Sequence, residues 1–220
     1  LTMSTIAMLI GSLVKGFQPY YILHDMTFTL TSFIFILILA PLTGLAGGFF
    51  RRFFQWAEKN QTKSKSILWQ LPAIALMTGL VAYFFPEIMG NGRSLAQFAI
   101  NSQQMHLVVV LVCGALLKVI ITVLTIRAGA AGGTLTPSIA VGSALGAVLV
   151  LLLNFFLPGV SVGQGAILGA GTLLAASQQA PFMAMFMLIE ITHLNYSALL
   201  PLALGIIISS AVSRKVLSKS

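Results

Sequence analysis

Apolar residues dominate long runs of this chain, and short polar stretches separate the runs. The runs cover residues 3–23, 28–56, 67–85, 105–126, 138–157 and 199–217. A helix needs roughly 20 apolar residues to cross the hydrocarbon core of a bilayer. The pattern therefore predicts an all-α, polytopic membrane protein with about five long spans and several shorter helices.

The run over residues 28–56 is longer than a membrane is thick. At about 1.5 Å per residue, a helix of this length reaches roughly 43 Å, against a hydrocarbon core of ~30 Å. We expect this helix to be strongly tilted, or to be kinked at Pro41.

Shorter segments that cannot span a membrane alone lie between the long runs. The stretch GNGRSLAQ at 90–97 predicts a turn followed by a short helix at about 94–101. Residues 163–176 are rich in Gly and Ala, and SQQAP at 177–181 separates that helix from a second one over 181–192. Two short helices in series, joined at a proline, predict a re-entrant pair over 163–192.

A broken helix is predicted over residues 127–146, which read RAGAAGGTLTPSIAVGSALG. The glycines and Pro137 do not suit a continuous membrane helix, so we expect a break and a restart at Thr136 or Pro137. The start of a helix presents unsatisfied N–H groups and a partial positive charge, which together can hold a small anion. On this hypothesis the amides of Thr134 and Leu135 face the anion, and Gly132 and Gly133 let the chain approach it closely. The alternative is that the glycines only allow tight helix packing.

Composition and charge support the membrane class. The 220 residues are 58% hydrophobic and 7% charged, and the net charge is +8. The basic residues cluster at the ends of the apolar runs, as the positive-inside rule expects, so we expect no nucleic-acid partner. The densest basic patch is typical of a cytoplasmic loop, with an anion-attracting vestibule as the alternative; it comprises Arg51, Arg52, Lys59, Lys63 and Lys65.

Ionisable residues inside apolar runs are candidates for function, because they are costly in a membrane. Lys118 lies in the middle of the run over 105–126, where it needs a partner or a water-filled cavity. Glu190 is either a proton carrier or a structural acid near a helix end. Arg93 either faces a pore or extends to the membrane interface.

Enzymatic and metal chemistry have no support in the sequence. The histidines His24, His106 and His193 lie at segment ends, and no pair of His, Cys, Asp or Glu residues has the spacing of metal ligands on a helix. No Lys-Ser or Lys-Thr follows the glycines, so the stretch is not a phosphate-binding loop. We expect no enzyme, no metal and no cofactor.

Three motifs resemble the ClC family of chloride channels and chloride/proton antiporters. GGTLTP at 132–137 is similar to the family's GxFxP motif, and LLAASQQAPFMAMFMLIEIT at 173–192 is similar to its LLAA-x-x-RAP segment; GNGRS at 90–94 fits its glycine-rich turn. The resemblance implies that the backbone amides of Thr134 and Leu135 bind the anion, with Gly132, Gly133, Thr136 and Pro137 shaping the site. It implies transport of chloride through a channel or an anion/proton antiporter. A fluoride/proton antiporter and a non-transporting membrane scaffold are the alternatives.

The resemblance covers only the second of the family's two inverted halves, so we expect residues 1–220 to be the C-terminal half of a ClC-type domain. The family's GSGIP and GREGP motifs, and the glutamate of the latter, do not occur here. We therefore expect the chain to form one wall of the pore and not to transport alone. The resemblance further implies a homodimer formed through the helices that match the runs over 3–23 and 28–56 and through the last two helices. The apolar faces of 181–192 and 199–208 would then be dimer surface, with Glu190 near the interface, in the inner membrane of a bacterium.

Overall fold

A computed structural model describes residues 29–154, 156, 159–194 and 196–218, together with residues 6, 10, 11, 13, 16 and 19–22. The run over 3–23 therefore lies mostly outside the described residues. Every regular element in the described ranges is helical, as predicted. Five of these helices are long and apolar enough to cross a membrane, namely α2, α3, α5, α6 and α9.

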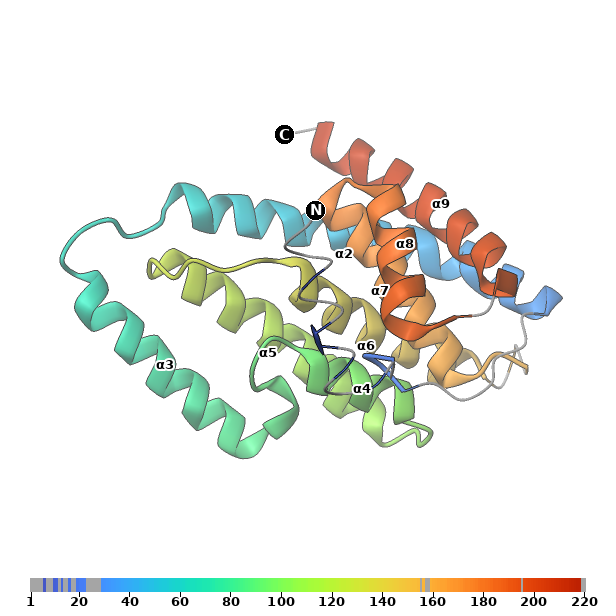
Figure 1. Cartoon of the computed structure of the whole chain (residues 1–220), viewed down its shortest axis with the longest axis horizontal. Coiled ribbons are helices and arrows are strands. Elements are labelled where there is room, and N and C mark those ends of the chain that lie inside the picture. Colours follow the sequence, from blue (N-terminus) through green and yellow to red (C-terminus); the bar gives the residue numbers. More distant parts are fainter. Residues whose placement is uncertain are drawn as a thin grey trace.

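The helices follow the chain in the order that Figure 1 labels. Their bounds are α2 Leu30–Lys59, α3 Ile67–Phe84, α4 Arg93–Asn101, α5 Leu107–Arg127, α6 Leu135–Leu153, α7 Val162–Gln178, α8 Pro181–Thr192 and α9 Leu199–Ser218. Two short 3-10 helices, η1 Pro86–Ile88 and η2 Tyr196–Ala198, precede α4 and α9. The 30 residues of α2 continue through Pro41, so this helix is about 45 Å long.

The restart after the break comes earlier than the sequence suggested. We expected Thr136 or Pro137 to begin the helix, but α6 begins at Leu135 with Thr134 as its N-cap. The amide of Ser138 donates to the carbonyl of Thr134 at 3.0 Å and closes the first turn. Pro137 is the third residue of the helix, where a missing N–H costs nothing. The helix also ends at Leu153, short of the predicted residue 157.

The ends of α7 are set by local chemistry. Ser161 and Gln164 form a reciprocal cap: the amide of Gln164 donates to Ser161 Oγ at 3.2 Å, and the amide of Ser161 donates to Gln164 Oε1 at 2.9 Å. At the other end Gln179 adopts a left-handed conformation with φ +57°, and Pro181 then begins α8. The predicted helix over 163–176 is therefore α7, extended at both ends.

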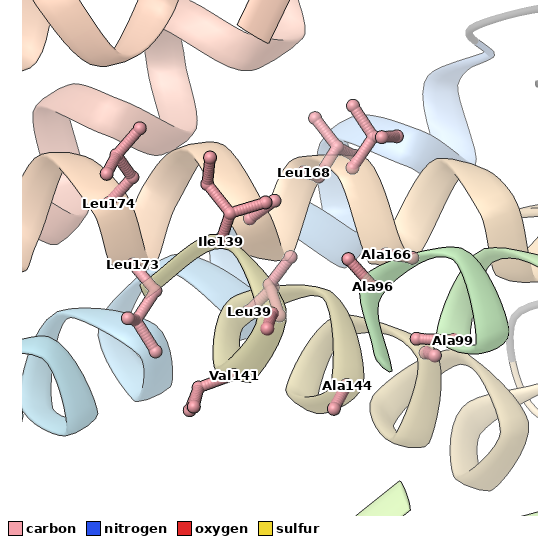
Figure 2. Close-up of a cluster of buried hydrophobic side chains, with 14 of the residues drawn as sticks. Leu39, Ala96, Ala99, Ile139, Val141, Ala144, Ala166, Leu168, Leu173 and Leu174 are labelled. Carbon is pink, nitrogen blue, oxygen red and sulfur yellow. The ribbon is translucent and has the colours of Figure 1, made fainter. Parts of the chain in front are cut away.

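The core lies where α6 packs antiparallel on α7. A Cβ added to Gly142 would lie 2.4 Å from the carbonyl oxygen of Gly169, and one added to Gly146 would lie 1.9 Å from that of Gly165. The two backbones thus touch without intervening side chains. Figure 2 shows the buried side chains around this contact, including Ile139 and Ala144 of α6.

The helix α3 stands at the edge of the molecule (Figure 1). Ala82 is its only buried residue among those described, although its sequence is apolar throughout. Its large side chains are therefore available to lipid or to another protein segment.

Replacing Gly146 by Ala should destabilise the protein, because the new methyl group would overlap the carbonyl oxygen of Gly165. We expect a loss of about 1–3 kcal/mol, typical of overpacking, visible as a lower unfolding temperature of the purified protein in detergent. Gly79→Ala is the matched control, since this helical glycine has open space at its Cβ position. Equal unfolding temperatures for the two variants would contradict the close contact between α6 and α7.

Candidate functional site

The start of α6 carries backbone donors that the fold leaves free. After α5 ends at Arg127, the chain runs back toward the middle of the molecule, where α6 begins (Figure 1). The amides of Thr134, Leu135 and Thr136 donate to no acceptor within the described part of the chain. Together with the positive end of the helix dipole, these donors can hold an anion.

A cavity of about 1010 Å³ opens beside the first turn of α6, where Leu135 and Thr136 line it. Its other walls come from α3, the turn after η1, one face of α5, and Gly132, Gly133 and Pro137. Gly132 and Gly133 are exposed, and a Cβ added to either would meet nothing within 4 Å. Tight packing is thus the role of Gly142 and Gly146, whereas Gly132 and Gly133 border open space.

Lys118 lies in the wall of the same cavity, with 4% of its surface exposed. Its ammonium donates to the carbonyl oxygens of Ile88 at 3.0 Å and Gly90 at 2.5 Å. The partner that we expected for the buried ammonium of Lys118 is therefore a pair of backbone carbonyls in the turn before α4.

That turn is also held against α6. Gly92 has φ +108°, which favours glycine, and a Cβ there would lie 2.9 Å from Ala140 Cβ and 3.3 Å from Lys118 Cε. The glycine-rich turn noticed in the sequence thus fills the space between Lys118 and the first turns of α6.

A second, smaller cavity of about 200 Å³ lies on another side of Thr134, between α2 and the end of α7. The side-chain amide of Gln178 donates to Thr134 Oγ1 at 2.9 Å. The hydroxyl of Ser177 donates to Ser138 Oγ at 2.9 Å, and that of Ser138 donates to the carbonyl of Thr134 at 2.6 Å. The last turn of α7 therefore holds the first turn of α6 in place.

Two arginines of the basic patch bind helix ends instead of lying in a loop. Arg51 Nη1 donates to the carbonyl of Ser177 at 2.8 Å, and Arg52 Nη2 donates to that of Val216. Both carbonyls lie in the last turn of a helix, α7 or α9, where a cation is stabilising. The loop interpretation was wrong for these two residues and for Lys59, which all lie within α2, whereas Lys63 and Lys65 are exposed in the loop that follows.

The other candidates lie away from both cavities. Arg93 stacks on the ring of Tyr20 at 4.2 Å and donates to the Tyr20 carbonyl at 2.9 Å. Glu190 is exposed on α8. Within the described ranges, no group of three or more His, Cys, Asp or Glu residues is placed to hold a metal ion.

Sequence patterns did not reveal Gln178 or the role of Arg51. Gln178 lies 44 positions from its partner Thr134, and Arg51 lies 126 positions from Ser177. No local spacing connects residues so far apart. The only sequence signal for the contact of Arg51 was an arginine at the end of an apolar run. The positive-inside rule accounted for that arginine, so no contact was expected.

Comparison with known proteins places these features in a family context. The family model for voltage gated chloride channels matches residues 1–214. The ClC-type chloride channel ClcB of Salmonella typhimurium is 28% identical over 221 residues, which cover 96% of this chain and 51% of that protein. ClcB of Citrobacter koseri is 30% identical over 183 residues, covering 78% and 42%. The chain thus spans about half the length of the curated relatives it matches.

Solved structures share the fold. A slow cyanobacterial Cl⁻/H⁺ antiporter superposes with a TM-score of 0.72 at 25% identity, over 89% of this chain and 46% of that one. A CLC-type fluoride/proton antiporter superposes with a TM-score of 0.67 at 22% identity, over 94% and 50%.

Replacing Lys118 by Met should lower stability, because the carbonyls of Ile88 and Gly90 would lose their donor. We expect a loss of about 2–4 kcal/mol for two acceptors left unpaired in a buried position, measured by thermal unfolding in detergent. Lys65→Met serves as the control, since Lys65 is exposed in a loop. If the two variants unfold at the same temperature, Lys118 does not hold the turn.

Proposed function

The chain belongs to the voltage-gated chloride channel family, and we propose that it supplies one wall of a membrane pathway for a small anion, with chloride as the anion. The family consists of transporters and not of enzymes. Because the chain spans about half the length of its relatives, the other wall comes from the half of the fold that precedes it in the family. The names of the ClcB relatives support chloride.

The observation that carries this proposal is the set of free amides at the start of α6, which face an open cavity. An anion there exchanges water for the amides of Thr134 and Leu135, with Gly132, Gly133, Thr136 and Pro137 forming the surrounding backbone. Amide dipoles replace hydration without a fixed countercharge at contact distance, so the anion can leave again. Lys118 in the cavity wall adds a positive charge that favours entry.

Coupling to protons requires an acid beside the anion pathway. None of the residues that line the larger cavity is acidic, and Glu190 is exposed on α8, away from it. We therefore assign any proton-carrying glutamate of the larger cavity to the other half of the fold; Glu58 lines only the smaller cavity beside Thr134. The similarity to a Cl⁻/H⁺ antiporter supports exchange as the mode of transport.

The exposed apolar faces of α8 and α9 support a homodimer. Phe182 and Phe186 of α8 are 75% and 62% exposed, and Leu200 and Ile207 of α9 are 68% and 65% exposed. We propose that these faces meet those of a second copy, in the inner membrane of a bacterium like those that carry the ClcB relatives.

The amide of Leu135 can be tested by replacing this residue with its α-hydroxy acid, which turns the N–H into an ester oxygen and keeps the side chain. The assay measures chloride flux in liposomes that contain this chain together with the first half of the fold. A hydrogen bond to a charged group contributes about 1.5–3 kcal/mol, so chloride should bind roughly 10-fold to 100-fold more weakly.

The same ester at Leu145, inside α6, is the control because its N–H belongs to the helix interior and Leu145 lines neither of the two cavities beside the start of α6. Unchanged chloride binding in the Leu135 ester would remove the amide from the site. The chain reconstituted without the first half should give no flux, and robust flux from it alone would overturn the proposal of a shared pore.

A further inference from the structure

The smaller cavity beside Thr134 is lined mainly by hydrogen-bond donors. Arg51 and Gln55 contribute from α2, Gln178 contributes from α7, and Thr134 contributes its side chain. Glu58 is the one acid in its lining, and this residue is exposed at the end of α2. Thr134 lines the smaller cavity, and the next residue along the chain, Leu135, lines the larger one, so the two cavities meet the chain at neighbouring residues.

Several donor groups that line this cavity have hydrogens that no acceptor in the described residues binds. The hydroxyl of Thr134 accepts from Gln178, so its own hydrogen must point to another acceptor. The amide of Gln178 keeps a second N–H. Arg51 uses one of its donors on Ser177, and a guanidinium carries five.

The charge of Arg51 also changes what the end of α7 presents to the cavity. The last carbonyls of a helix form its negative end, which repels anions. By binding the carbonyl of Ser177 at 2.8 Å, the guanidinium offsets that negative end beside Thr134. The cavity therefore combines a cation and neutral donors with one exposed acid, Glu58, at the end of α2.

We propose that this smaller cavity is a second anion-binding station, in which the hydroxyl of Thr134, the amide of Gln178 and the guanidinium of Arg51 are the ligands. The inference rests on the proposed function, since it places the station next to the amides of α6 on the same pathway. Side-chain donors of this strength favour the anion that accepts the strongest hydrogen bonds, so the station raises fluoride transport relative to chloride.

The hydroxyl is tested with Thr134→Val, which keeps the shape of the side chain and removes the donor. Fluoride and chloride fluxes are measured in liposomes with the same two-half assembly. The ratio of fluoride to chloride flux should fall roughly threefold to tenfold, the effect of one hydrogen bond. Thr134→Ser restores a hydroxyl and should recover most of the ratio.

The guanidinium is tested with Arg51→Gln, which should raise the chloride concentration at half-maximal flux severalfold. Arg52→Gln is the matched control: it removes an arginine from a helix end, but Arg52 does not line the cavity. The half-saturating concentration should therefore stay at the wild-type value in Arg52→Gln, whatever that variant does to stability.

The outcomes separate the two proposals. Absence of anion flux in the wild-type assembly contradicts the proposed function. Wild-type flux with an unchanged fluoride-to-chloride ratio in Thr134→Val means that the cavity holds water only, and the second station is then wrong. An equal rise of half-saturation in the Arg51 and Arg52 variants would mean that Arg51 acts only as a helix cap.

Discussion

The antiparallel contact of α6 with α7 determines where the end of α7 lies. Gly142 faces Gly169, and Gly146 faces Gly165, so the two backbones run past each other in opposite directions at close range. The last turn of α7 must then lie beside the first turn of α6. Without further groups, this geometry would place the negative end of one helix next to the positive end of the other, and the anion-binding capacity of α6 would be weakened.

The surrounding residues resolve this conflict by pairing the acceptors and leaving the donors free. Arg51 binds the carbonyl of Ser177, Lys118 binds those of Ile88 and Gly90, and Ser138 binds that of Thr134. The amides at the start of α6 keep no partner in the described residues. In a membrane, unpaired backbone groups persist only where they line a cavity. An excess of free donors over free acceptors is the electrostatic condition for an anion pathway, and here it follows from a few hydrogen bonds.

The sequence predicted the elements well but not the contacts that connect them. Glycine, proline and apolar run lengths located the break before α6 and the pair α7 and α8, because these signals are local. The restart was misplaced by one or two residues, since Thr136 or Pro137 was expected to begin the helix and Leu135 begins it. The roles of Gly132 and Gly146 were not separable, because a glycine that borders open space and one that touches a helix read alike in sequence. The link from Arg51 to Ser177 spans 126 positions and depends on the packed fold.

In the proposed anion site, Thr134 contributes two chemically different parts, its backbone and its hydroxyl. Its backbone N–H is one of the amides at the start of α6. No side-chain replacement removes this N–H, so any sequence that starts a helix here presents it. Its hydroxyl, fixed by Gln178 at 2.9 Å, is present only because of the side chain at this position. In the proposed site, backbone donors supply a general affinity for anions, whereas side-chain donors such as Thr134 and Gln178 would set the preference among them. The glycine contacts that place α6 on α7 involve Gly142, Gly146, Gly165 and Gly169, so they do not depend on the side chains of Thr134 and Gln178.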